Sequence, residues 1–394
     1  MNSISFRVAA AVLTFVIGIS VATVWAFTRT QPTIKPVDVR NETPTLEMVF
    51  VVDTTGSMGG LIEGAKQRIW GIVNEVMQQQ SHPAVKIGLV AYRDRGDQYV
   101  TQVLPLTEDL DKVYMTLMQY QAEGGGDEPE DVRRALLDGL QKAGWSRTAP
   151  RIAQVLFLVG DAPPHTDYKG EQDTLETAAQ AVDLGIVVNT IQCGSSAQTK
   201  EVWESIARRG EGQYFAIPQT GGVQAISTPY DEDLSKLGTK LGGTYLAYGG
   251  GAGIEGEHFR GEAKRIADTS EATVAASAPM EARALRSINK LVNANAYIGD
   301  LLQNIENGSV KLESVKEADL PDELKKLSPE ERKQEVDKRL AERKEIRNQI
   351  LSLSKLRADH VAAQQKKQGI SSHNSFDVAV SAALKEQLAK KGIK

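Results

Sequence analysis

Two rhythms of hydrophobic and polar positions succeed one another along residues 45–220. Runs in which nearly every residue is apolar, such as VFVV before Asp53 and VLFLVG before Asp161, predict strands buried on both faces. The stretches between them place apolar residues three and four positions apart, which is the period of an amphipathic helix. Strands that alternate with helices form a parallel sheet covered on both faces. We therefore predict a doubly wound, mostly parallel sheet in a domain spanning residues 45–245.

The apolar runs and the helical periods give approximate residue ranges for the predicted strands and helices. The strands are expected at residues 46–53, 84–92, 99–106, 151–161, 185–193 and 212–217. The helices are expected at residues 57–80, 108–120 and 129–144, and around Leu175 and Trp203.

The pattern changes beyond residue 254. Residues 255–394 are rich in Ala, Lys and Glu and contain no strand pattern, so a helical C-terminal region is predicted. Ser328 and Pro329 form a helix start, and that helix can continue to about Gln368. Its apolar positions keep loosely to one side and lose the heptad after Leu340, which favours a single packed stripe over a long coiled coil.

The N-terminus carries a different signal. Twenty residues from Val8 to Phe27 contain no charge, which is enough to span a bilayer. We predict that residues 1–30 are an uncleaved transmembrane anchor; the alternative is a cleaved signal peptide, which normally has a shorter apolar core and a clearer cleavage site. Residues 31–44 then form a linker. A short tail before a first hydrophobic segment usually stays in the cytoplasm, so we predict a single-pass cell-membrane protein with an extracytoplasmic (periplasmic) body.

Charge and cysteine content narrow the chemistry. A formal net charge of −5 does not indicate a nucleic-acid partner. The sequence contains one cysteine, Cys193, so an internal disulfide and a thiolate metal cage are both excluded.

Oxygen-bearing side chains gather where the predicted strands end. Asp53 and Asp161 each follow an apolar strand, and a glycine-rich loop between them in sequence carries Asp127 directly before a predicted helix. Because parallel strands end at one edge of a sheet, these carboxylates and the hydroxyls of Thr55 and Ser57 are expected to converge. Such hard oxygen ligands suit Mg²⁺ (or Mn²⁺). The alternatives are helix caps at Asp53, Ser57 or Asp127, and a turn residue at Asp161. His165 is expected to form hydrogen bonds at the rim. The loop with Arg93 and Asp94 is expected at the same edge of the sheet, as a solvated loop.

These residues also carry a resemblance. Asp53-Thr54-Thr55-Gly56-Ser57, the later Gly-Gly loop and Asp161 resemble the motifs of von Willebrand factor A (VWA) domains, which include the inserted domains of integrins. The resemblance implies a Rossmann-like sheet. It also implies a metal-ion-dependent adhesion site (MIDAS), with Asp53, Thr55, Ser57, Asp127 and Asp161 as its metal residues. It also implies a protein partner that donates an Asp or Glu carboxylate to the metal. Family members usually have Thr where this chain has Asp127, and Glu128 and Glu130 are the alternatives for a ligand from this loop. With the anchor, the chain resembles bacterial membrane-anchored proteins of this type.

We therefore predict a non-enzymatic, metal-dependent protein-binding module tethered to a membrane. One alternative is a phosphohydrolase resembling the haloacid dehalogenases, in which an Asp also follows a buried strand. That family has a second Asp two residues later, where this chain has Thr55. The other alternative is an adaptor of an AAA+ ATPase, which requires a cytoplasmic body.

Overall fold

The computed structural model describes five stretches of the chain: residues 44–77, 83–220, 226–293, 299–368 and 376–393. The predicted anchor at residues 1–30 lies outside them, as does the predicted linker apart from Pro44. None of the helices within these stretches is long and apolar enough to cross a membrane.

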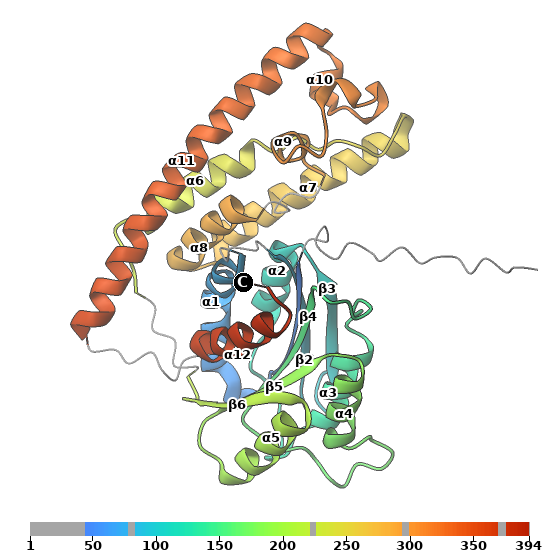
Figure 1. The fold of residues 1–394 in the computed structure, drawn as a ribbon, viewed down its shortest axis with the longest axis vertical. Coiled ribbons are helices and arrows are strands. Elements are labelled where there is room, and N and C mark those ends of the chain that lie inside the picture. The colour runs from blue at the N-terminus through green and yellow to red at the C-terminus, as the bar shows by residue number, and fades with distance from the viewer. Residues whose placement is uncertain (1–43, 78–82, 221–225, 294–298, 369–375, 394) are drawn as a thin grey trace, which may run out of the picture. The chain divides into compact units, whose positions relative to one another are not determined.

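Six strands of the described residues form one sheet in the order β3-β2-β1-β4-β5-β6 (Figure 1). They are β1 (Thr45–Asp53), β2 (Ala84–Tyr92), β3 (Thr101–Thr107), β4 (Ile152–Gly160), β5 (Val187–Cys193) and β6 (Glu211–Ile217). All neighbouring pairs are parallel except β2 and β3, which are antiparallel. The predicted fold class, a mostly parallel Rossmann-like sheet, is therefore confirmed.

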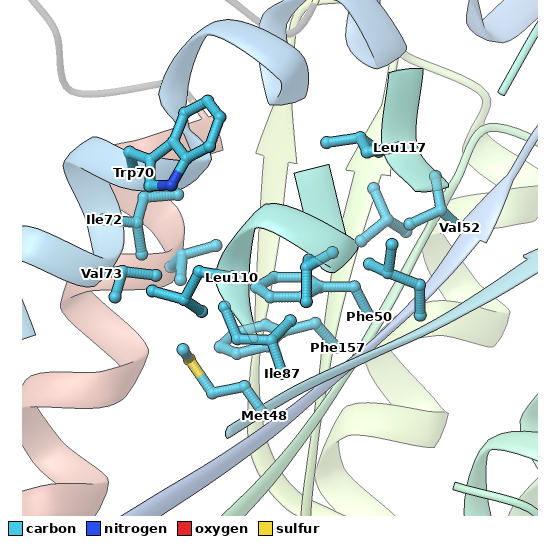
Figure 2. Packing of buried hydrophobic residues seen from close by; sticks show 14 of the residues in the cluster. Met48, Phe50, Val52, Trp70, Ile72, Val73, Ile87, Leu110, Leu117 and Phe157 are labelled. Carbon is cyan, nitrogen blue, oxygen red and sulfur yellow. The ribbon is translucent and has the colours of Figure 1, made fainter. Parts of the chain in front are cut away.

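Helices cover both faces of the sheet, as alternating side chains of β1 show. Met48 and Phe50 pack toward α1 (Gly59–Met77) and α2 (Leu110–Gln119), and Phe50 stacks on Phe157 with 5.1 Å between ring centroids (Figure 2). Val49 and Val51 belong to the core of the opposite face. That face is covered by α3 (Val132–Gln141), α4 (Thr174–Asp183) and α5 (Ala197–Arg209). A strand with apolar residues at consecutive positions is thus buried on both sides, as its sequence predicts.

The described part of the chain beyond β6 forms a mainly helical region, as predicted. Its helices are α6 (Asp231–Gly243), α7 (Gly253–Ser277), α8 (Met280–Val292), α9 (Leu301–Glu306), α10 (Asp322–Lys325), α11 (Pro329–Gln368) and α12 (Phe376–Lys390). The long helix α11 begins after a capping box in which Ser328 and Glu331 exchange hydrogen bonds. Its apolar residues divide between two clusters: Ile346 and Ile350 pack with α6 and α8, whereas Val336 packs near α9 and α10.

Two helices pack mainly with elements that are distant in sequence. Helix α6 shares a core with α8 and α11. Helix α12 returns to the sheet and contacts α1, β4, β5 and β6 (Figure 1). Its buried side chains Val380, Leu384 and Leu388 belong to the same core as Phe50. The division of the chain near residues 245–255 stays a prediction, and these contacts show what separation would expose.

Candidate metal centre

The two strand-end carboxylates lie at one edge of the sheet. Asp53 ends β1, Asp161 follows β4 directly, and the two strands pair in parallel register. Gly160 permits the close approach of β1, β2 and β4, because a Cβ atom there would lie 2.5 Å from the hydroxyl oxygen of Tyr92 and 3.0 Å from the Cβ of Asp53. The sequence prediction that both carboxylates emerge at the carboxyl edge agrees with this placement.

Asp53 is fully buried and is held by Thr55. The backbone N–H of Thr55 donates to Asp53 Oδ1 at 2.8 Å, and the Thr55 hydroxyl donates to the same oxygen at 2.6 Å. Oδ2 is buried and has no hydrogen-bond partner among the described residues. Burial raises the pKa of Asp53 to about 7; the Thr55 hydrogen bonds offset part of this rise, and the Asp161 carboxylate adds to it. This carboxyl group therefore has one oxygen, Oδ2, available to a ligand.

The three predicted loops meet around a cavity of about 320 Å³. The backbone N–H of Gly56 donates to the carbonyl oxygen of Gly124 at 3.2 Å and so joins the first loop to the second. Ser57 lies in the 3₁₀ turn Gly56–Met58 and is exposed. The cavity is lined by Thr55, Gly56, Ser57, Gly124, Gly125, Asp127, Glu128, Glu130, Asp161 and Ala162.

Glu130, an alternative to Asp127 in the second loop, lines the cavity although the five predicted metal residues do not include it. Its backbone forms a parallel bridge with Pro164: the Glu130 N–H donates to Pro163 O at 3.0 Å, and the His165 N–H donates to Glu130 O at 3.1 Å. The side chain is 3% exposed, and within the described part of the chain its Oε2 has no hydrogen-bond partner. Burial raises the pKa of Glu130 to about 9, and the nearby carboxylate of Asp53 contributes to the rise. A further acidic group therefore faces the same cavity.

Asp161 is tied to the segment after β6. Its Oδ2 accepts a hydrogen bond from Gln219 Nε2 at 2.5 Å, and the same nitrogen donates to the carbonyl oxygen of Ser57 at 3.1 Å. The backbone oxygen of Asp161 accepts from the Thr199 hydroxyl at 2.9 Å, near the start of α5. The first and third loops are thus held together through an amide donor.

Asp127 lies between the cavity and the side chain of His165. It lines the cavity, but its exposed side chain also brings Oδ2 to 3.7 Å from His165 Nε2. Among the described residues, one group of three acidic or histidine side chains has all its ligand atoms within 4.8 Å of one another: Asp94, Asp127 and His165. The carboxylates of Asp53, Glu130 and Asp161 do not form such a group. Asp127 is not the cap of the next helix, because α3 begins at Val132 and Asp131 is its N-cap, accepting from the Arg134 N–H at 3.1 Å.

A sequence model described as the von Willebrand factor A domain matches residues 47–229. These residues form a VWA domain. The match covers the six-stranded sheet and the three loops of the cavity. VWA domains generally serve in protein interactions rather than catalysis, and many of them bind a divalent metal ion.

Curated relatives share this domain. VWA domain-containing protein 7 of Rattus norvegicus is 32% identical over 155 residues, covering 34% of this chain and 17% of the relative. The Homo sapiens protein of the same name is 38% identical over 186 residues, covering 47% of this chain and 19% of the relative. A putative ariadne-like RING finger protein R811 of Acanthamoeba polyphaga mimivirus is 27% identical over 123 residues, covering 30% of this chain and 11% of the relative. The matched region therefore spans less than a fifth of each relative.

Two solved structures are also similar. The crystal structure of the SpRpn10 VWA domain has 15% identity and a TM-score of 0.34, covering 47% of this chain and 99% of that one. The proximal thread matrix protein 1 from the mussel byssus has 13% identity and a TM-score of 0.33, covering 45% of this chain and 42% of that one.

Proposed function

We propose that the VWA domain binds a protein partner through a divalent cation, Mg²⁺ or Mn²⁺, held at the carboxyl edge of its sheet. The observation that carries this proposal is a pair of buried carboxylate oxygens, Asp53 Oδ2 and Glu130 Oε2, that lack partners among the described residues. Burying acidic groups without a counter-charge is costly. A divalent ion supplies the missing charge and returns both groups to the ionised form.

The side chains present fit such an ion. Asp53, Ser57 and Asp161 are the principal candidates to hold it, and Thr55 orients Asp53 through the hydrogen bonds to Oδ1. Glu130 adds a carboxylate from the second loop, and Asp127 lines the same cavity. All of these groups are hard oxygen ligands, and Mg²⁺ keeps several waters, so not every one needs to contact the ion. When bound, the cation offers a position that an Asp or Glu of the partner can occupy.

Non-enzymatic binding is proposed over the phosphohydrolase alternative. In that family a carboxylate two residues after the nucleophilic Asp transfers the proton. Here that position is Thr55, whose hydroxyl donates to Asp53 Oδ1 at 2.6 Å. A hydroxyl engaged in this way orients Asp53 and does not replace a carboxylate as a general acid or base.

Calorimetric titration of Mg²⁺ into the full chain tests the cation. We expect one Mg²⁺ to bind the wild-type chain and the Asp53→Asn/Asp161→Asn variant to lose that binding. The matched control is Asp337→Asn/Asp359→Asn, which removes two exposed carboxylates of α11. Undiminished Mg²⁺ binding by the Asp53→Asn/Asp161→Asn variant would refute the site.

The partner's chemistry is tested with Mn²⁺ in place of Mg²⁺. Water relaxation near bound Mn²⁺ reports how many exchangeable waters the ion retains. A short peptide with a central Glu should lower the relaxation enhancement by replacing a water, whereas the same peptide with Gln should not. Equal effects of the two peptides would contradict binding through a carboxylate.

Membrane tethering is proposed from the uncharged run at Val8 to Phe27. Flotation with phosphatidylcholine vesicles should carry residues 1–394 to the top of a gradient and leave residues 31–394 at the bottom. Reporter fusions to the C-terminus then test the proposed extracytoplasmic orientation; a cytoplasmic reporter would favour the AAA+ adaptor.

A further inference from the structure

Three side chains from three different loops converge beside the first cavity. Asp94 follows β2, Asp127 belongs to the glycine-rich loop, and His165 lies after β4. His165 Nε2 lies 3.4 Å from Asp94 Oδ2 and 3.7 Å from Asp127 Oδ2. The three ligand atoms all lie within 4.8 Å of one another.

The imidazole ring of His165 is held in one orientation. Its Nδ1 lies 2.9 Å from Asp167 Oδ1, and its ring stacks on Tyr168 with 4.2 Å between centroids. The Tyr168 hydroxyl in turn lies 2.7 Å from each carboxylate oxygen of Asp94, to which it donates. Because a carboxylate accepts hydrogen bonds, Nδ1 carries the proton. In the neutral ring Nε2 is then the nitrogen with a lone pair.

This lone pair points at the two carboxylates. His165 is 9% exposed, and its Nε2 is buried with no hydrogen-bond partner in the part of the chain that the structure describes. An acceptor nitrogen facing two acceptor carboxylates is unfavourable unless a positive charge lies between them. Either a proton on Nε2 or a metal cation can supply that charge.

We propose that Asp94, Asp127 and His165 bind a divalent first-row transition-metal cation, with Zn²⁺ as the representative ion. Imidazole nitrogen and carboxylate oxygen are both ligands of Zn²⁺, whereas Mg²⁺ prefers oxygen alone. Asp167 acts as the carboxylate that orients a ligating histidine through its other nitrogen. The site uses neither Asp53 nor Asp161, but it shares Asp127 with the lining of the first cavity.

Bound metal would join three loops of the binding edge. His165 is also connected to Glu130 through the backbone hydrogen bond from its N–H. A cation held by Asp94, Asp127 and His165 therefore fixes the strand-end loops after β2 and β4 relative to the loop that carries Glu130. A cation at this second site therefore holds the loops that form the first cavity in fixed positions relative to one another.

Cobalt absorption tests the proposal with the full chain. Co²⁺ replaces Zn²⁺ and gives visible bands whose intensity depends on the ligands, and saturating Mg²⁺ is present to occupy the first site. We expect the wild-type chain to show these bands and Zn²⁺ to displace them. His165→Gln should weaken Co²⁺ binding at least about tenfold, because the imidazole ligand is lost. Asp167→Asn should weaken binding by a smaller factor and shift the bands.

Two further variants make the test selective. His258→Gln, at an exposed position on α7, should leave the bands unchanged. Asp127→Asn removes an exposed ligand, with a side chain 62% accessible, and is the variant least disruptive to folding; it should weaken Co²⁺ binding while the protein keeps its circular dichroism spectrum.

Three outcomes would overturn the second site. The first is a wild-type chain that shows no bands under saturating Mg²⁺; a protonated Nε2 in the NMR spectrum would then identify a His–Asp ion pair instead. The second is full Co²⁺ binding by folded His165→Gln and Asp127→Asn. The third is loss of the bands in Asp53→Asn/Asp161→Asn alone, which would place the cobalt in the first cavity and support the proposed function while refuting this site.

Discussion

Asp53 and Glu130 are two buried carboxyl groups close to each other at the carboxyl edge of the sheet, and Glu130 lines the cavity there. Burial raises the pKa of each, and the Asp53 carboxylate contributes to the rise at Glu130. Each retains a buried oxygen for which the described residues provide no hydrogen-bond partner. Residues with this arrangement destabilise the metal-free fold and gain most from a cation, which is typical of a binding site rather than of a structural core.

We expect Glu130→Gln to weaken Mg²⁺ affinity by about tenfold or more, because a ligand carboxylate is lost while the shape is kept. The same substitution should raise the melting temperature of the chelator-treated protein, because a buried acidic group is removed. Calorimetric titration measures the first effect and differential scanning calorimetry the second. Glu128→Gln, at an exposed position of the same cavity, is the control. Unchanged affinity in Glu130→Gln would place Glu130 outside the cation site.

The sequence could place some of these residues and not others. Asp53 and Asp161 follow apolar runs, so the ends of parallel strands predict where they lie. Asp127 and Glu130 share one loop, and no local pattern indicates which of them turns inward. The choice is made by the bridge between Glu130 and Pro164, a pairing with a residue more than thirty positions away. For the same reason the sequence predicts His165 at the rim and Asp94 in a solvated loop, whereas the structure brings the two side chains together and buries both.

At the scale of elements, α12 completes a face of the sheet. Leu384 is 1% exposed and belongs to the core beneath α1. Asn189 of β5 and Gln387 of α12 also form a buried hydrogen bond of 3.0 Å. The sequence predicts this helix but not its position, because an amphipathic pattern indicates that one face is buried and does not name the surface that covers it.

We expect Leu384→Ala to lower the free energy of unfolding by about 2–5 kcal/mol, because it leaves a cavity between α12 and the sheet. Urea denaturation of the full chain measures this change. Leu351→Ala, at a position 59% exposed on α11, is the control and should change stability by less than about 0.5 kcal/mol. Equal, small effects of the two substitutions would show that α12 does not stabilise the sheet in solution.

At the scale of the whole molecule, the sheet domain and the helical region share contacts that the predicted division would break. Helix α1 packs against both α8 and α12. Asn74 of α1 donates to the backbone oxygen of Leu285 at 3.0 Å and accepts from Asn289 at 2.9 Å. A buried polar pair of this kind is costly to separate, because each amide would lose its partner.

We therefore expect residues 41–394 to unfold in one calorimetric transition, with equal van't Hoff and calorimetric enthalpies. Residues 45–245 alone lack α8 and α12, so they should unfold at a lower temperature than the longer chain. Two separate transitions in residues 41–394, with one matching the shorter chain, would show instead that the sheet domain is independent.

An ion pair connects the same two parts and gives stability a pH dependence. Arg286 Nε of α8 donates to Asp111 Oδ1 of α2 at 2.6 Å, and the Ser270 hydroxyl of α7 donates to Asp111 Oδ2 at 2.8 Å. Burial by itself raises the pKa of Asp111, but the charge and hydrogen bonds of Arg286 outweigh it and lower the pKa from 3.8 to about 2. The folded protein therefore binds this proton more weakly than the unfolded chain does.

The sign of the effect follows from that difference. The ionised form of Asp111 stabilises the fold by about 2 kcal/mol, and this contribution is fully present above about pH 4. It is lost as the pH falls through about 2, and about half of it is gone by pH 3. Asp111→Asn should then be less stable than the wild-type chain at pH 6, and the gap in the free energy of unfolding should narrow at pH 3. Urea denaturation at the two pH values measures the gap, with Asp337→Asn on α11 as an exposed control. A gap of equal size at both pH values would mean that Asp111 joins α2 to α8 by its shape and neutral hydrogen bonds, and that its charge adds nothing to the cohesion of the two regions.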